Sequence, residues 1–410
     1  MRRLLCGLLL ACLPLAAAGA DTASPLVRVV VLRHGVRAPT SGPAELAPYA
    51  NRDWHAWPVA PGMLTEHGAQ GMTALGARYR RLFAADGTWS GQCDARDQLV
   101  IIADSTPRNR ASGAALARGL APDCAAPYLA LPETQSNPLF HFGKEDKDDD
   151  LSAAPATWPP AALAELQSVL LGCTGDDCLA QARSHQRKLL LDAADDRARA
   201  KALKQAGSLS ENLMLEYAQG FPAATVAWGQ GDEAAIGRLI GLHNLQFDLA
   251  KRRMPAAARG GSNLLAHILA TLQRAAGMET PVAPLASADA RVVLLVAHDT
   301  NLAQLGGLLD VDWRDARQPD EYPPGGALVF DLVREHGVDS VRLSSWMPTP
   351  DALRRADVSR PDALVRRTLG LPACDGKASC PLPVFAHWLE QRVDPAAYDP
   401  AMPALPANLP

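Results

Sequence analysis

The chain has 410 residues, with 40 Lys and Arg against 44 Asp and Glu and a formal net charge of -4 at pH 7. Charges so nearly balanced create no overall field that would attract nucleic acid or an anionic membrane, so neither is expected as a partner. The length exceeds what a single hydrophobic core usually serves, so two domains are expected.

The first 20 residues have the pattern of a cleaved export signal. Arg2 and Arg3 form a positive start, residues 4–15 an apolar core, and Ala18-Gly19-Ala20 a small-residue cleavage site. In a bacterium this signal predicts a periplasmic location. A lipoprotein attached through Cys12 is the less favoured alternative, because the cleavage site at Ala20 is better placed. No later segment reaches about 18 consecutive apolar residues, so no membrane span is expected.

An apolar, valine-rich run over residues 26–32 predicts a strand buried on both faces. It ends in Arg33-His34-Gly35-Val36-Arg37-Ala38-Pro39-Thr40. Ligands of open α/β sheets collect beyond the carboxyl ends of strands, and two arginines can hold a phosphoryl group by charge-assisted hydrogen bonds. His34 is therefore a candidate nucleophile that would form a phosphohistidine, with Arg33 and Arg37 as phosphate ligands. A structural role of His34 in the turn is the competing interpretation of so short a motif.

Two further segments have the same design of strand, polar loop and helix. Residues 99–102 lead into Ala103-Asp104-Ser105-Thr106-Pro107-Arg108-Asn109-Arg110, where one arginine can complete the phosphate-binding set. Residues 292–296 lead into Ala297-His298-Asp299-Thr300-Asn301. Here His298 can donate to the phosphate and Asp299 can protonate the departing alkoxide, a step that general acid catalysis accelerates about 10²- to 10⁴-fold. Capping of the next helix by Asp299 or Thr300 is compatible with that role.

The middle of the chain is predicted to be helical. Between about residues 150 and 280 no strand-like run of comparable strength occurs, and residues 186–206, 211–219 and 233–253 have helical periodicity. We therefore expect an α/β domain formed by residues 21–145 and 255–393, with a mainly helical insertion at 146–254. The acidic segment 143–150 is expected to be a connector rather than a calcium loop, because it lacks the spaced ligands of an EF-hand. Residues 394–410, rich in Pro and Ala, are expected to be a tail on the surface or without order.

Of the eight cysteines, Cys6 and Cys12 lie in the predicted signal. The other six can form three disulfides in an oxidising compartment, and their spacing alone leaves the connectivity open: Cys93, Cys124, Cys173, Cys178, Cys374 and Cys380. They lack the paired spacing of a zinc site, so no metal is expected. The remaining histidines, His243 among them, are expected to be surface or structural residues.

These motifs resemble those of the histidine acid phosphatases, in the bacterial periplasmic branch that contains 4-phytases and glucose-1-phosphatases. Arg-His-Gly-Val-Arg-Ala-Pro-Thr and His-Asp-Thr-Asn are that family's two catalytic signatures. Further similarities lie at residues 64–68, 101–104, 119–124, 219–222 and 323–326. The resemblance implies an α/β fold, with a phosphoglycerate-mutase-like sheet domain that has helices on both faces and an inserted, mainly helical cap domain.

The resemblance also assigns roles by motif. His34 corresponds to the nucleophile and Asp299 to the proton donor. The implied phosphate-binding residues are Arg33, Arg37, Arg110 and His298, and Arg108 is expected to be solvated or structural. Thr40 and Glu211 match contacts near the inositol of phytases. The implied disulfides are Cys93–Cys124, Cys173–Cys178 and Cys374–Cys380. Because water is the final acceptor, no cofactor is implied, and we expect a monomer that acts on a small phosphomonoester.

The substrate is less determined by these motifs. Phytases of this branch usually have Lys, Asp and Arg where this chain has Ser41, Thr106 and Gly261, and the loss of two cations should weaken binding of a ligand with many phosphates. Residues 220–229 are more similar to glucose-1-phosphatases. We expect a phytase-like acid phosphatase, with a glucose-1-phosphatase or broad sugar-phosphate phosphatase as the alternative. A non-catalytic phosphoester-binding protein is the alternative of a different class. Phosphoglycerate-mutase-like transfer is disfavoured by the export signal, the cysteines and the His-Asp pair.

Overall fold

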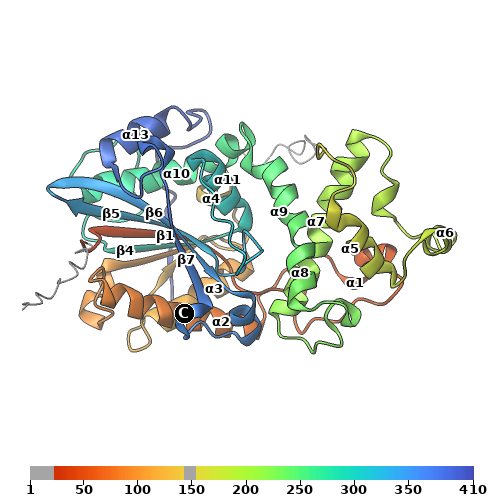
Figure 1. The fold of residues 1–410 in the computed structure, drawn as a ribbon. Helices are drawn as coiled ribbons and strands as arrows, with labels where there is room; N and C mark the ends of the chain where they lie inside the picture. Colours follow the sequence, from red (N-terminus) through yellow and green to blue (C-terminus); the bar gives the residue numbers. More distant parts are fainter. Residues whose placement is uncertain (1–22, 143–153) are drawn as a thin grey trace, which may run out of the picture.

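The protein is a mixed sheet flanked by helices, with a group of helices at one end (Figure 1). The computed structural model describes residues 23–142 and 154–410. The predicted export signal and the acidic connector at 143–150 lie outside the described residues. The strands are β1 (Val27–Arg33), β2 (Leu99–Ala103), β3 (Tyr128–Leu129), β4 (Val292–Ala297), β5 (Ala327–Glu335), β6 (Val338–Pro348), β7 (Leu364–Leu369), β8 (Cys380–Pro381) and β9 (Ala407–Asn408).

The sheet order is β7-β6-β5-β1-β4-β2-β3-β9, and β8 pairs with β6. β4 lies between β1 and β2 and is parallel to both. Arg33 at the end of β1 is in register with Ala297, and Ala103 at the end of β2 is in register with Val296. The three polar loops that follow these strands therefore begin at the same edge of the sheet, as the sequence predicts.

Helices cover both faces of the sheet (Figure 1). Alternate residues of a strand point to opposite faces, and β1 shows this in its packing. Val30 and Leu32 pack in one core with residues of α2 (Glu66–Ala85) and α3 (Pro107–Leu120). Val29 and Val31 pack in a second core with residues of α4 (Pro138–His141), α10 (Ala256–Ala275), α11 (Asp299–Leu309) and α13 (Leu382–Glu390). The predicted α/β fold with a doubly covered sheet is confirmed.

The remaining helices gather at one end of the sheet (Figure 1). They are α5 (Ala161–Leu171), α6 (Asp176–Ser184), α7 (Asp196–Ala218), α8 (Glu233–Leu239) and α9 (Gly241–Phe247). Most of them share a third hydrophobic core, which also takes in Val36, Leu46 and Trp54. Leu46 belongs to the short helix α1 (Pro43–Leu46), and α12 (Pro350–Arg355) packs against α7. We propose that these helices form the cap domain, to which the segment after β1 contributes, although the sequence placed that segment in the α/β domain.

The C-terminal tail is tied to the sheet. Ala407 and Asn408 form β9, which pairs with β3 in antiparallel fashion at one edge. The expectation of a tail without order is therefore wrong for these residues.

The three disulfides implied by the family resemblance are confirmed: Cys93–Cys124, Cys173–Cys178 and Cys374–Cys380. Among residues 23–142 and 154–410, no helix combines the length and the apolar character needed to cross a bilayer.

The close approach of α2 to α3 depends on glycine. A Cβ added at Gly76 would lie 2.4 Å from the backbone oxygen of Leu116, whereas one at Gly71, in the same helix, would lie 3.8 Å from its nearest neighbour. We expect Gly76→Ala to lower the free energy of unfolding by about 1–3 kcal/mol through overpacking. Gly71→Ala should instead be neutral or stabilise by up to about 1 kcal/mol, because alanine is the better helix former. Thermal and urea unfolding of both variants test this, and equal stability would contradict it.

Candidate active site

His34 lies directly after β1 and is 1% exposed. Its Nδ1 is 2.9 Å from the backbone oxygen of Gly35. Because a carbonyl oxygen only accepts hydrogen bonds, the ring proton belongs on Nδ1 and the lone pair on Nε2. Burial and the neighbouring guanidinium groups of Arg108, Arg33 and Arg37 hold the pKa of His34 well below its usual range. The ring is therefore neutral, with Nε2 available as a nucleophile.

Arg33 and Arg37 share one carboxylate, that of Glu211. Arg33 is fully buried. It pairs with Glu211 through Nη2 and donates from Nη1 to the backbone oxygen of Tyr322 at 2.5 Å. Nη2 of Arg37 is 3.0 and 3.1 Å from the two Glu211 oxygens. Glu211 lies on α7, so a cap helix supplies the charge that balances these arginines. The structure thus brings Glu211 next to both predicted phosphate ligands.

The third arginine of the cluster is Arg108, not Arg110. Nη2 of Arg108 is 3.3 Å from Nδ1 of His298. Burial and the guanidinium of Arg37 lower the pKa of Arg108. Arg110 instead donates to the Leu131 oxygen at 2.7 Å and to Oδ1 of Asn408 at 3.0 Å. The expectation for Arg110 is therefore wrong, and so is the solvated role expected for Arg108.

The sequence did carry a signal for this choice. Pro107 occupies the first turn of α3, so the helix begins immediately after the strand-end loop. Residues two apart on an α-helix point to nearly opposite sides, because one turn takes 3.6 residues. Arg108 and Arg110 could not both face the edge of the sheet, and Arg108 is the one nearer to the end of β2.

The three clustered arginines keep free donors. The Nε atoms of Arg33, Arg37 and Arg108 are buried and have no hydrogen-bond partner among the described residues. A buried charged donor without a partner is costly unless a ligand satisfies it. Three such donors beside the free Nε2 of His34 make a site for an oxyanion with several acceptor oxygens.

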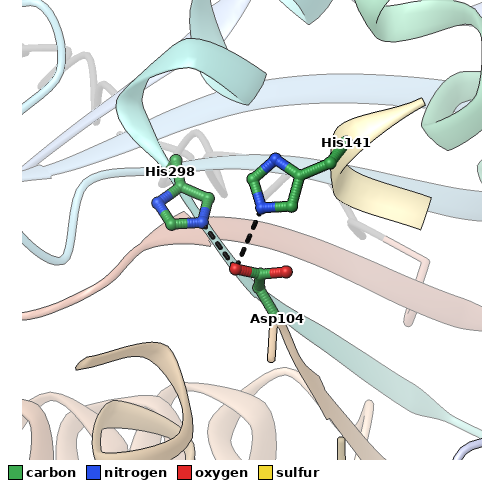
Figure 2. Close-up of side chains that lie close together, drawn as sticks. All are labelled: Asp104, His141 and His298. Atoms are coloured by element: carbon green, nitrogen blue, oxygen red, sulfur yellow. Dashed lines mark hydrogen bonds and ion pairs between the residues drawn. The ribbon is translucent and has the colours of Figure 1, made fainter. Parts of the chain in front are cut away.

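Asp104 lies within hydrogen-bond distance of His298 (Figure 2). No function was expected of Asp104 from the sequence. Nε2 of His298 lies 2.8 Å from Oδ2 of Asp104, and Nε2 of His141 lies 3.1 Å from the same oxygen. Burial of Asp104 opposes ionisation, but the hydrogen bonds from His141 and His298 hold its pKa well below its usual range. Burial is the largest of the effects that lower the pKa of His298 to about 4, against the stabilising hydrogen bond to Asp104.

Asp299 is the first residue of α11. Its Oδ2 is 3.0 Å from Nη2 of Arg33, and its Oδ1 accepts from the backbone nitrogen of Thr300 at 2.7 Å. His243 is 2% exposed, and its ring, Glu211 and Asp299 each place one atom within 4.8 Å of the others. Burial opposes ionisation of Asp299, yet Arg33, His243 and His34 hold its pKa well below its usual range. His243 thus belongs to the cluster, whereas the sequence gave it no chemistry.

The remaining predicted positions lie around this cluster. Thr40 is exposed, and Gly62 lies between it and Arg108, since an added Cβ there would be 3.8 Å from Thr40 Cγ2 and 4.0 Å from Arg108 Nη1. Thr106 precedes α3, and its hydroxyl donates to Oδ1 of Asn109 at 2.8 Å. Gly261 packs against α11, where an added Cβ would be 2.9 Å from Leu308 Cδ1. A larger side chain at Gly261 would therefore require at least the side chains of Leu308 and Gln304 to shift.

Comparison with known proteins places the chain among phosphatases. Residues 27–345 match the family model of the histidine phosphatase superfamily (branch 2). The chain is 31% identical to phytase AppA of Escherichia coli, over 90% of this chain and 92% of that protein. It is 25% identical to the glucose-1-phosphatase of Salmonella typhimurium, over 87% of this chain and 90% of that protein. The apo structure of Hafnia alvei phytase superposes with a TM-score of 0.79 at 29% identity, covering 93% of this chain and 100% of that one.

The pair Arg108 and Arg110 gives a direct test of the cluster. We expect Arg108→Gln to weaken binding of inorganic phosphate by about 10- to 100-fold, because a hydrogen bond to a charged group contributes about 1.5–3 kcal/mol. Arg110→Gln should leave phosphate affinity within about twofold and lower stability instead, since its partners are Leu131 and Asn408. Isothermal titration measures the phosphate affinity of both variants. A larger loss of affinity in Arg110→Gln would restore Arg110 as the predicted phosphate ligand.

Proposed function

Because the chain belongs to the histidine phosphatase superfamily (branch 2), we propose that His34 carries a phosphoryl group between substrate and water, and that phytate is the main substrate. One observation supports this chemistry above the others. The neutral His34 ring presents Nε2 among three arginines, two buried and one half-buried, whose buried Nε donors have no partner among the described residues.

In the first step the phosphoryl oxygens accept hydrogen bonds from Arg33, Arg37 and Arg108. Nε2 of His34 attacks phosphorus and forms a P–N bond while the P–O bond to the substrate alcohol breaks. Asp299 gives its proton to the departing oxygen, so the alcohol leaves neutral. Donors fixed in a buried site need no rearrangement as charge shifts, which is the main source of stabilisation in such a step.

In the second step water replaces the alcohol. The carboxylate of Asp299 takes a proton from the water as its oxygen attacks phosphorus, and the P–N bond breaks. Inorganic phosphate leaves and His34 regains its lone pair. Asp299 is protonated again while phosphate is bound, as it was in the substrate complex.

The charges of the ligand-free site explain why Asp299 can donate a proton only when substrate is bound. Arg33 and its neighbours hold the pKa of Asp299 well below its usual range, so the empty site has no proton to give. A phosphate dianion neutralises the arginines and repels the carboxylate, and both effects raise the pKa of Asp299. The same negative charge favours the doubly protonated form of His298, whose Nδ1 then donates to phosphate while Nε2 stays on Asp104.

The choice of phytate is supported by similarity along nearly the whole chain. The relative at 31% identity is a phytase, and Hafnia alvei phytase in complex with myo-inositol hexakis sulphate superposes with a TM-score of 0.76 at 28% identity. Thr40 is exposed near Arg108, and Glu211 pairs with Arg33 and Arg37, so the proposal includes both as substrate contacts. Glucose-1-phosphatases at 25% and 23% identity support the alternative of a sugar-phosphate phosphatase, as do Ser41, Thr106 and Gly261.

The sequence pattern of residues 1–20 further supports export to the periplasm, and we keep a monomer that needs no cofactor as part of the proposal.

The test is phosphate release from phytate, glucose 1-phosphate and p-nitrophenyl phosphate between about pH 3 and 7, where a carboxyl proton donor titrates. We expect phytate to have the highest kcat/KM in the absence of added metal. The matched control is His34→Ala, which should lose turnover by at least about 10³-fold yet still bind phosphate. A higher kcat/KM for glucose 1-phosphate would select the sugar-phosphate alternative, and no release from any ester would favour the non-catalytic binding protein.

Asp299→Asn separates the proton donor from the rest of the site. The variant should slow esters of alcohols by about 10²-fold or more, because their alkoxides leave poorly without a proton. p-Nitrophenyl phosphate should be slowed much less, since nitrophenolate leaves as a stable anion. The ratio of the two kcat values is the measurement, and equal slowing of both esters would argue against a proton-donor role.

A further inference from the structure

Three side chains that can ligate a metal ion lie close together, and one of them is the predicted phosphate donor His298 (Figure 2). Asp104 follows β2, His141 ends α4, and His298 follows β4. Both imidazole Nε2 atoms point to one carboxylate oxygen, Oδ2 of Asp104, at 3.1 Å from His141 and 2.8 Å from His298. The three ligand atoms lie within 4.8 Å of one another.

We propose that Asp104, His141 and His298 bind one divalent transition-metal ion, zinc most readily, and that the ion inhibits the enzyme. Zinc takes imidazole nitrogens at about 2.0–2.1 Å and carboxylate oxygens at about 2.0–2.2 Å in a tetrahedral arrangement, which places neighbouring ligand atoms about 3.3 Å apart. The present separations from Asp104 Oδ2 are only slightly shorter. Small rotations of the two rings would therefore convert a hydrogen-bonded cluster into three ligands with a fourth position open.

The carboxylate of Asp104 has unused capacity for an ion. Asp104 is fully buried, and its Oδ1 has no hydrogen-bond partner among the described residues. A buried carboxylate oxygen without a partner is costly, so an ion held by Oδ1, alone or together with Oδ2, would relieve that cost. Two histidines and one carboxylate are a ligand set that zinc uses in proteins.

A second group with metal-ligating atoms, Glu211, His243 and Asp299, is a poorer competitor. The two carboxylates there already pair with the guanidinium groups of Arg33 and Arg37. A cation would have to displace these arginines or sit beside their charges, which Coulomb repulsion disfavours. Asp104 makes no such pair with an arginine among the described residues.

Inhibition follows from the ring of His298. When Nε2 binds the ion, the remaining ring proton must lie on Nδ1. In the empty site Nδ1 faces Nη2 of Arg108 at 3.3 Å, and two donors at that distance repel when no phosphate oxygen lies between them. The rotation of the His298 ring that the ion requires also turns Nδ1 from the position in which it would donate to phosphate, so the ion and the proposed phosphate contact compete for one orientation of His298. The ion is therefore an inhibitor of this site and no part of its catalytic cycle.

The test uses the full mature chain and zinc chloride as the probe, in a buffer that does not chelate metals. Isothermal titration should show one zinc ion per chain in the wild type. His141→Asn should weaken that binding by about tenfold or more, because it removes a ligand while leaving Arg108 and the phosphate-binding residues in place. His243→Asn is the matched control and should bind zinc as the wild type does. Circular dichroism of each variant verifies that it is folded.

Cobalt(II) gives a readout that is independent of turnover. Four-coordinate cobalt absorbs visible light strongly, and we expect that band in the wild type and in His243→Asn but not in His141→Asn. Zinc should also slow hydrolysis of p-nitrophenyl phosphate at lower concentration in the wild type than in His141→Asn. Equal zinc affinity in the wild type and His141→Asn would overturn the proposal, as would a loss confined to His243→Asn or full turnover with zinc bound.

Discussion

The parallel pairing of β1, β4 and β2 is the constraint on which the site depends. Register along these strands decides which residues leave the sheet together, and here Arg33 aligns with Ala297 and Ala103 with Val296. A slip of one residue would turn every side chain of a strand to the other face, moving Val30 and Leu32 away from α2 and α3. Because both faces of β1 are packed, the hydrophobic core itself fixes the register. The positions of His34, Asp104 and His298 are consequences of that packing, and they do not depend on a flexible loop.

Electrostatics then gives this edge its chemical character. Three guanidinium groups crowd a neutral histidine, and the carboxylates of Glu211 and Asp299 balance the most deeply buried one, that of Arg33. Removing one partner of such a buried pair is costly, so the cluster is rigid before any ligand arrives. In the proposed function, phosphate enters a site in which the charges are already arranged and adds negative charge to it. On this proposal the same arginines depress the pKa of Asp299 in the free protein and permit proton donation when substrate is bound.

The sequence predicts the fold and the centre of the site because both are encoded in short, contiguous patterns. Valine-rich runs predict β1 and β4, and the polar residues after them include His34, Arg33, Arg37, His298 and Asp299, which the structure brings together. The choice between Arg108 and Arg110 required the rotation of a helix, which the motif does not state. His141 and His243 join the clusters through contacts between distant segments, so no local pattern marks them. The pairing of β9 with β3 is likewise a long-range contact, made by a segment whose Pro- and Ala-rich composition does not predict a strand.

Glu211 has a consequence for how the two parts of the molecule can change over evolutionary time. In the proposed function the sheet carries the nucleophile His34 and the cap helices contact the rest of the substrate, so variation in those helices would be a route to new specificity. Glu211 on α7 should not vary in this way, because it balances the charges of Arg33 and Arg37 across the boundary between the cap and the sheet. A lineage could reshape most of the cap without changing these contacts, but loss of this carboxylate would remove the ion-pair partner of Arg37 and one of the partners of Arg33. The cap is therefore constrained where its charges meet those of the sheet, at Glu211 and at His243 beside Asp299.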